Sequence, residues 1–161
     1  MNKTTAAILG AWLFTAALAT QARAGTADFP EYGFAIDALD AKPSAAAPTT
    51  ALMMFLPASD GFGPNVNVNI QPYPGSMNEY ISLSKAQFQK MSWTVVDEKQ
   101  VGDAEWKVEY KGPMKGNDLH FYARAVSKDG KVYLVTATAQ DSQWNTVGST
   151  LRSHVDSFKA K

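Results

Sequence analysis

Few residues in this sequence could do chemistry, and the first to consider are Asp118, His120 and His154. Asp118 and His120 stand two apart in a segment expected to be a strand, so both side chains can point to one face, and His154 can approach from a C-terminal helix. Imidazole and carboxylate are common metal ligands. In the alternative, His120 is a half-buried strand residue and His154 a boundary position on a helix. Because the sequence has only two histidines, we favour the alternative and predict no metal site and no cofactor.

Patterns typical of covalent catalysis or phosphate binding are missing. There is no Gly-x-Ser-x-Gly, and Gly148-Ser149 falls inside an expected helix rather than on a tight turn. No lysine follows the glycine-rich stretch Gly61 to Pro64, so a phosphate-binding loop is not formed there. With no cysteine, there is no thiolate nucleophile, thiolate zinc site, iron–sulfur cluster or disulfide. The sequence therefore predicts a protein without enzymatic activity.

A surface that binds another protein is the remaining kind of site. Phe62 lies in a loop rich in glycine and proline, where it could protrude as an anchor for a partner or fold back and cap the core. Asn67 and Asn69 belong to an asparagine ladder. With nearby Tyr73 this ladder could form a polar shelf for a sugar, or it is simply a solvated strand face. We select Phe62, Asn67, Asn69 and Tyr73 as the candidate partner-binding residues.

Length and charge narrow the classes of function further. The chain has 161 residues, 45% of them hydrophobic, and fifteen basic residues against fifteen acidic ones. This size and apolar content suit one globular domain. A protein that binds nucleic acid needs a basic surface to displace counterions from phosphate, so the balanced charge argues against nucleic acid as a partner.

The first 24 residues predict a cleaved export signal. Lys3 precedes the apolar run Ala6–Ala19, and the small residues Ala22 and Ala24 suit a signal peptidase that cuts after Ala24. The alternative is a membrane anchor, but as a helix this run spans only about 21 Å of a hydrocarbon core about 30 Å thick. We therefore expect residues 25–161 to be exported to the periplasm or secreted, without stable insertion in a membrane.

The hydrophobic pattern of the remaining chain predicts short strands and two helices. Residues 65–71 alternate apolar and polar side chains without error, whereas residues 51–56 are apolar on both faces, which is typical of a strand covered on both sides. Ser76 and Glu79 match a capping box that begins a helix, and Asp129-Gly130 suits a type I′ hairpin turn. The expected strands are 32–36, 51–56, 65–71, 93–101, 103–111, 119–126 and 131–139.

Together these elements predict an α+β fold, with one domain over residues 25–161 and a mainly antiparallel sheet flanked by helices on both faces or on one. The first helix is expected at 77–91, and the second carries an apolar stripe from Trp144 to Phe158. In strand 103–111, alternation turns Trp106 and its apolar neighbours inward and Glu109 and its charged neighbours outward.

Several segments within Tyr32 to Phe158 carry a resemblance to a known family. They are Phe55-Leu56-Pro57, Asp60-Gly61-Phe62, Asn65 to Val68, the helix around Tyr80 to Met91, Val132 to Ala139, Gln143-Trp144 and Asp156-Ser157-Phe158. In their order and in their hydrophobic and aromatic positions, these segments resemble the Mog1/PsbP/DcrB-like superfamily of small α/β/α sandwich domains.

The resemblance implies a binding or accessory module without a shared enzymatic activity. Members that resemble PsbP are extrinsic subunits of a photosystem, Mog1-like members bind a small GTPase, and DcrB-like members act in the bacterial cell envelope. We therefore expect a non-enzymatic accessory protein whose partner is another envelope protein. A periplasmic carrier of a small ligand is the alternative, and it predicts a cavity of at least a few hundred Å³, on the order of known ligand pockets, between sheet and helix. An unrecognised hydrolase is the third hypothesis.

Overall fold

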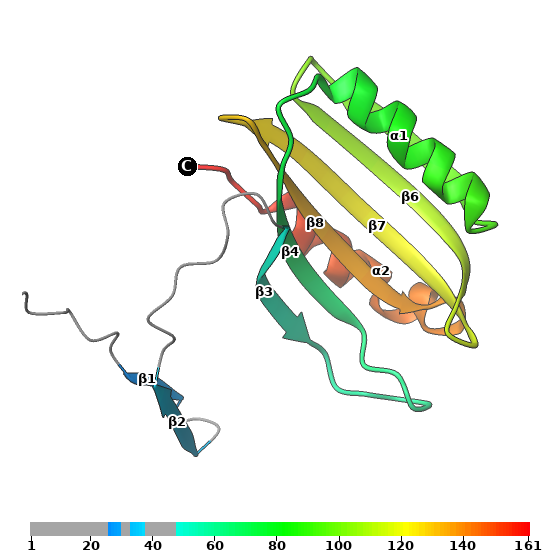
Figure 1. Ribbon diagram of the computed structural model, residues 1–161. Coiled ribbons are helices and arrows are strands. Elements are labelled where there is room, and N and C mark those ends of the chain that lie inside the picture. The colour runs from blue at the N-terminus through cyan, green and yellow to red at the C-terminus, as the bar shows by residue number, and fades with distance from the viewer. Residues whose placement is uncertain (1–25, 30–32, 38–47) are drawn as a thin grey trace, which may run out of the picture. The chain divides into compact units, whose positions relative to one another are not determined.

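A computed structural model of the chain describes residues 26–29, 33–37 and 48–161 (Figure 1). The export signal expected at residues 1–24 lies outside the described residues. The chain divides into two compact units, Met1–Lys42 and Pro43–Lys161, and each is described by itself. No helix in the described residues has the length and hydrophobicity needed to span a membrane.

The first unit contains an antiparallel pair of strands, β1 (Thr26–Phe29) and β2 (Phe34–Asp37). The Thr26 hydroxyl donates a hydrogen bond to Asp37 Oδ1 at 2.8 Å across this pair. The sequence predicts only the second of these strands, at 32–36. The first was missed because its four residues are too few to show an apolar alternation.

The second unit is built on one antiparallel sheet of six described strands in the order β3-β4-β8-β7-β6-β5 (Figure 1). The predicted α+β class and the predicted order of these elements are confirmed. Each strand pairs with its neighbours in antiparallel register. The strands are β3 (Thr49–Phe55), β4 (Asn65–Pro72), β5 (Thr94–Val101), β6 (Glu105–Met114), β7 (Asn117–Lys128) and β8 (Lys131–Gln140).

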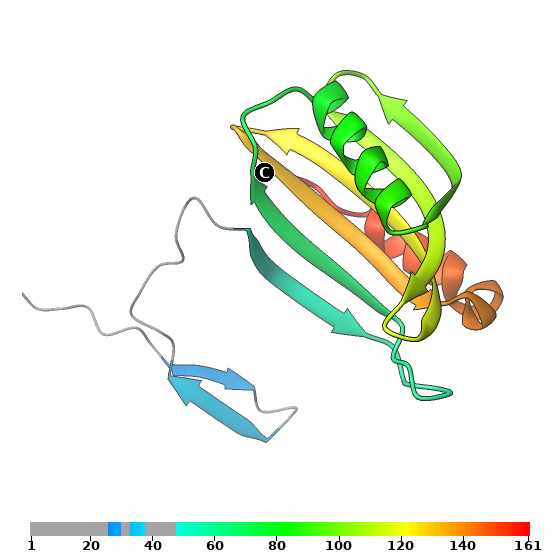
Figure 2. The same ribbon diagram turned by 45° about the vertical axis from the view of Figure 1, so that its right-hand side comes forward.

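Two helices cover opposite faces of this sheet, as the two views show together (Figures 1 and 2). The first, α1 (Met77–Lys90), packs on the face that carries Trp106, Val108 and Phe121. The second, α2 (Asp141–Asp156), packs on the other face against Val135 and its neighbours in β8. Each strand thus contributes side chains to two separate hydrophobic cores, because its successive side chains point to opposite faces of the sheet.

Turn residues at two hairpins have the backbone conformation that tight turns require. Asp129 and Gly130 have φ values of 52° and 70°, which confirms the turn predicted between β7 and β8. Lys115 and Gly116, with φ values of 51° and 82°, form an equivalent turn between β6 and β7. The strands predicted at 103–111 and 119–126 are therefore longer in the structure, because this turn needs only two residues and the residues beside it pair as strand.

The capping box predicted at the start of α1 is confirmed. Glu79 N donates to Ser76 Oγ at 3.3 Å, and Ser76 N donates to Glu79 Oε2 at 2.8 Å. The hydrogen bonds that the Ser76 backbone N and hydroxyl donate to the Glu79 carboxylate lower the pKa of Glu79 below its ordinary value. The first turn of α1 therefore has two of its backbone donors satisfied.

We predict that Ser76→Ala lowers the free energy of unfolding by about 1 kcal/mol, the usual effect of losing a cap. Chemical denaturation followed by circular dichroism measures the change. Ser82→Ala is the matched control, because the Ser82 hydroxyl donates to the Asn78 carbonyl within the same helix and caps nothing. Equal destabilisation by the two substitutions would contradict the role of the cap.

Candidate functional site

The three residues considered for a metal site do not meet. Asp118 is exposed at the start of β7, and His154 Nδ1 donates to the Thr150 carbonyl of its own helix at 2.8 Å. His120 is buried under α2, with Nδ1 at 2.8 Å from Asp141 Oδ1 and Nε2 at 2.7 Å from Glu109 Oε1. The two carboxylates lie on opposite sides of the ring, so they do not converge on one ion. Among the described residues, no group of three such side chains is placed to hold a metal.

His120 instead belongs to a buried polar cluster that joins α2 to the sheet. Its ring stacks on Trp144, with centroids 4.1 Å apart and planes 7° apart. Glu109 Oε1 also accepts hydrogen bonds from Trp144 Nε1, at 3.2 Å, and from Arg152 Nη2. The hydrogen bond from His120 holds the pKa of Asp141 below its ordinary value. The residue pattern alone does not connect Glu109 with His120, because their contact depends on how β6 and β7 pair.

The four candidate partner-binding residues are spread over the side of the sheet that faces α1. Asn67 and Asn69 lie side by side on β4, where Asn69 Nδ2 donates to Asn67 Oδ1 at 2.7 Å. Tyr73 packs edge-on against Tyr80, with ring centroids 5.3 Å apart. Phe62 is half-buried against the core under α1. The structure thus brings the two asparagines together and turns Phe62 inward, and the partner-binding role of the four residues stays a prediction.

The edge strand β3 departs most clearly from the sequence analysis. Residues 51–56 were expected to be covered on both faces, and this was wrong. Leu52, Met53, Met54 and Phe55 are 46%, 50%, 42% and 64% exposed. Within the described residues β3 pairs only with β4, so its outer backbone edge carries no neighbouring strand. An apolar strand exposed on both faces and open along one edge is typical of a surface that pairs with another chain.

The opposite edge of the sheet is protected in the usual way. The outer strand β5 carries Asp97, Glu98 and Lys99, and charged side chains on an edge disfavour pairing with another strand. The strand β3, Thr-Thr-Ala-Leu-Met-Met-Phe, has no charged residue. Among the described strands, the two edges of the sheet therefore differ: β5 carries charged side chains and β3 carries none.

A groove of about 240 Å³ runs beside β3 on the side of α2. Met54 and Phe55 form one wall, and Leu151 and His154 of α2 contribute to the other. Side chains of an added strand that point to this face would enter the groove, because alternate residues of a strand share a face.

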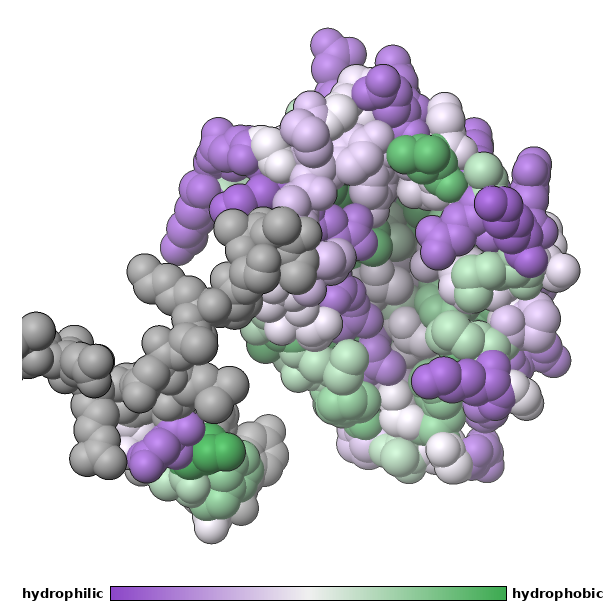
Figure 3. Space-filling view, in the orientation of Figure 1, coloured by the Kyte–Doolittle hydropathy of each residue, from purple (hydrophilic) through white to green (hydrophobic). Residues whose placement is uncertain are grey.

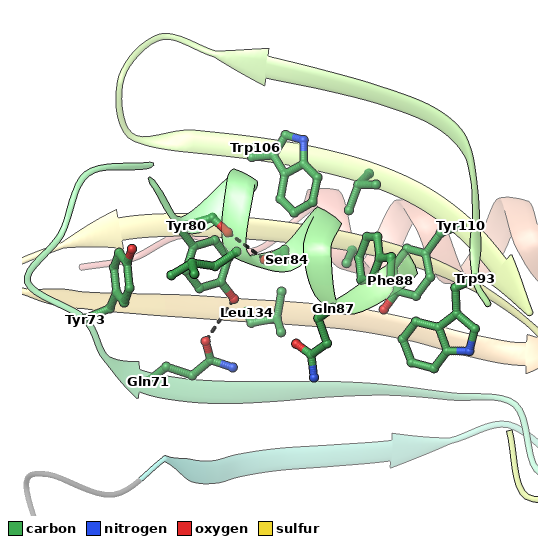
Figure 4. A pocket seen from close by; sticks show the side chains of 13 residues that line it. Gln71, Tyr73, Tyr80, Ser84, Gln87, Phe88, Trp93, Trp106, Tyr110 and Leu134 are labelled. Carbon is green, nitrogen blue, oxygen red and sulfur yellow. Dashed lines mark hydrogen bonds between the residues drawn. The ribbon is translucent and has the colours of Figure 1, made fainter. Parts of the chain in front are cut away.

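A second hollow lies between α1 and the sheet and has a volume of about 350 Å³. The alternative hypothesis of a small-ligand carrier predicts a cavity of this size in this place. Figure 4 shows that its walls are mainly aromatic and that Gln71 and Gln87 extend from opposite sides toward the gap between β4 and α1. The lining residues are Gln71, Tyr73, Tyr80, Leu83, Ser84, Gln87, Phe88, Trp93, Trp106, Val108, Tyr110, Ala123 and Leu134.

The family model of PsbP matches residues 63–160, which is more than half of the chain. The chain belongs to the PsbP family. This assignment confirms the resemblance seen in the sequence, and the matched region includes β4 to β8 and both helices of this PsbP-family protein. No curated protein is significantly similar to it in sequence.

Three solved structures are similar to it, and the fold is shared with the first of them. PA94 from Pseudomonas aeruginosa, a protein of unknown function, is 13% identical with a TM-score of 0.61, over 84% of this chain and 96% of that one. Cyanobacterial PsbP (CyanoP) from Synechocystis sp. PCC 6803 is 14% identical with a TM-score of 0.47, over 75% and 98%. LpqN from Mycobacterium tuberculosis, involved in cell envelope biogenesis, is 14% identical with a TM-score of 0.40, over 71% and 84%. At these identities the likeness concerns the fold alone.

Proposed function

We propose that this PsbP-family protein is an exported, non-enzymatic accessory protein of the cell envelope that binds another envelope protein through β3. The observation that carries the proposal is the apolar, uncharged edge strand, exposed on both faces while the other edge is charged. The export signal expected at residues 1–24 supports the location. The chain also belongs to the PsbP family, and the resemblance to the PsbP-like superfamily implies an accessory or binding module. This supports a non-enzymatic accessory function.

The partner expected from this geometry is an extended segment that adds to the sheet beside β3. Its backbone would hydrogen-bond to the open edge, and alternate side chains would contact the two faces. On the face of α2 they would lie over Met54 and the groove beside it. On the other face they would lie over Met53, whose neighbour in β4 is Asn67. In this proposal Asn67 and Asn69 lie beside the partner surface on β4, and β3 forms its centre.

A hydrolase is less well supported by the geometry around the candidate base. Both ring nitrogens of His120 are within hydrogen-bond distance of carboxylates, and the ring is stacked on Trp144. A general base needs a free nitrogen that reaches the nucleophile. The small-ligand carrier, by contrast, is favoured by the cavity under α1, which is considered separately below.

We predict that the double substitution Leu52→Glu and Met53→Glu abolishes capture of the partner. It places one charge on each face of β3, where an added strand would have to bury it. The measurement is affinity capture from envelope preparations of cells that express the chain, with a photo-crosslinking residue at position 53 to identify the protein in contact. At least a tenfold loss of the crosslinked partner is expected.

Val96→Glu is the matched control, because Val96 is 51% exposed on the other edge strand. It should leave capture unchanged, and a crosslinking residue at position 96 should not label the same protein. Equal capture by the wild type and the β3 variant would refute the proposed surface. If position 53 crosslinks only to a second copy of the chain, β3 mediates self-association and the proposed envelope partner is refuted.

A further inference from the structure

The cavity between α1 and the sheet has the composition of a binding site for a small ring compound. Its volume of about 350 Å³ falls in the lower part of the roughly 300–1,000 Å³ range of ligand pockets. Val108, Ala123 and Leu134 form an aliphatic floor on three adjacent elements of the sheet. Aromatic rings from α1, β6 and the segment before β5 form the walls (Figure 4).

The aromatic walls are held in place by packing among themselves. The rings of Phe88 and Tyr110 stack with centroids 4.3 Å apart, and Trp93 stacks on Tyr110 at 5.3 Å. Trp106 Nε1 donates to Glu98 Oε2 at 3.2 Å, which fixes its indole. Because these rings are already fixed, a flat ligand can pack against them without ordering the side chains, and ordering side chains is a main cost of binding.

Three polar groups at the cavity have hydrogen-bonding capacity that is not used within the described residues. Tyr110 is only 7% exposed, and its hydroxyl, which Figure 4 shows directed toward the region of Gln87, has no hydrogen-bond partner among them. The amide of Gln87 likewise has none. Gln71 Oε1 accepts from the Tyr80 hydroxyl at 2.9 Å, which leaves its amide nitrogen to donate. A hydroxyl that faces a cavity and has no partner in the protein can donate to or accept from a ligand.

The charge of the ligand follows from the lining. Among the described residues that line the cavity, none is charged. Burial raises the pKa of Tyr110 well above its ordinary value, so its hydroxyl stays neutral. An ionised ligand would lose its hydration without gaining a counter-ion, which is strongly unfavourable. The cavity is therefore suited to a neutral molecule.

The small number of polar groups in the cavity favours an aromatic compound over a sugar as the ligand. A sugar carries hydroxyls around its whole ring, and those facing Val108, Ala123 and Leu134 would be buried without partners, which is unfavourable for each of them. An aromatic ring has no polar groups on its faces and needs partners only for its substituents. The two amides at the gap between β4 and α1, together with the Tyr110 hydroxyl directed toward Gln87, match one or two such substituents.

A ligand has a direct way in. Gln87 is exposed on α1, Gln71 is half-buried on β4, and the two side chains lie at the gap between these elements. In the space-filling view the surface is hollowed beside α1 (Figure 3). The floor of the cavity, by contrast, is formed by the buried Val108 and Ala123 and the half-buried Leu134.

We propose that the cavity under α1 binds a small neutral aromatic compound with one or two hydrogen-bonding groups at one edge. This site lies between α1 and the sheet and is separate from the outer edge of β3. It is therefore independent of the proposed protein partner, and either proposal can fail without the other.

The proposal is tested with 2-naphthol as the probe, titrated into the purified chain by isothermal calorimetry. We expect saturable binding at one site, at least tenfold tighter than binding of 2-naphthoate, which has the same rings and a negative charge, and of glucose. Ser84→Phe projects a ring from α1 into the cavity and should abolish binding. Tyr110→Phe removes only the hydroxyl and should weaken binding about tenfold.

Tyr133→Phe is the control for Tyr110→Phe, because the Tyr133 ring packs against Phe158 on the other side of the sheet, away from the cavity. It should leave the affinity for 2-naphthol unchanged. The proposal is overturned by lack of binding, by binding that Ser84→Phe leaves intact, or by tighter binding of 2-naphthoate or glucose. Should Ser84→Phe fail to fold, Tyr110→Phe decides alone, and an unchanged affinity in that variant overturns the proposal.

Discussion

Glu109→Gln will lower the free energy of unfolding by about 3 kcal/mol, the range seen when one partner of a buried ion pair is removed. Glu109 Oε1 accepts hydrogen bonds from Trp144 and Arg152 and lies 2.7 Å from His120 Nε2, so its carboxylate faces an indole, a guanidinium and an imidazole. The substitution keeps the shape of the side chain and removes its charge. His120 is then left buried between one carboxylate and an amide, while Arg152 loses its anionic partner and retains partial access to water.

Urea denaturation at neutral pH measures this change, and Lys111→Met is its control. Lys111 Nζ lies 3.5 Å from Asp141 Oδ2 in the same region, but both side chains are largely exposed. A surface pair of this kind contributes about 0–1 kcal/mol, so the control should shift stability by less than about 1 kcal/mol. A loss below 1 kcal/mol in Glu109→Gln would show that the cluster does not hold α2 on the sheet.

The second large effect is expected for Gly112→Ala, at about 3 kcal/mol, the upper part of the range for overpacking in a core. A Cβ atom on Gly112 would overlap the indole of Trp93 and lie 3.1 Å from the Trp93 Cα. The indole is not free to move, because it packs on Tyr110 and Phe121 and donates from Nε1 to the Pro113 carbonyl at 3.0 Å. The strain must therefore displace backbone.

Thermal unfolding followed by near-ultraviolet circular dichroism measures this loss and the change around the indole together. Gly63→Ala is the matched control, since its added Cβ would meet Phe55 Cδ1 at 3.4 Å, an ordinary contact. The control should change stability by less than about 0.5 kcal/mol, as most surface substitutions do. If both alanine variants unfold at the wild-type temperature, the close approach of Gly112 to Trp93 has no energetic importance.

Elements with a strong local signal were predicted correctly from the sequence. The asparagine-valine alternation of β4, the Ser76 cap and the Asp129-Gly130 turn all depend on residues close together in the chain. Such features can be predicted from the sequence because strand alternation, helix capping and turn conformation depend on residues that are adjacent in the chain. The fold class followed from their order.

The exposed strand β3, the cluster around Glu109 and the cavity depend on how segments distant in the chain pair and pack. The residue pattern therefore does not reveal them. Residues 51–56 read equally well as a central or an edge strand, since the apolar pattern does not say which strands flank it. Glu109 was correctly expected on the face away from Trp106, but that face lies under α2 rather than in solvent. The cavity was expected only under the hypothesis of a small-ligand carrier. Its existence depends on how the side chains of α1 and the sheet pack, and the hydrophobic pattern of the sequence does not show this.

The sheet order has a consequence for how the protein is made. Synthesis releases β3 and β4 before any other strand of the sheet, yet β4 pairs with β8, the last strand to be made. The hairpins from β5 to β8 can close between neighbours in the chain, whereas the junction of β4 and β8 must close a long loop, which is slower. Until β8 has been made, the uncharged strand β3 and its neighbour β4 have no partner strand in the rest of the sheet. The growing chain is therefore most vulnerable to misassembly just before the β7–β8 hairpin is complete.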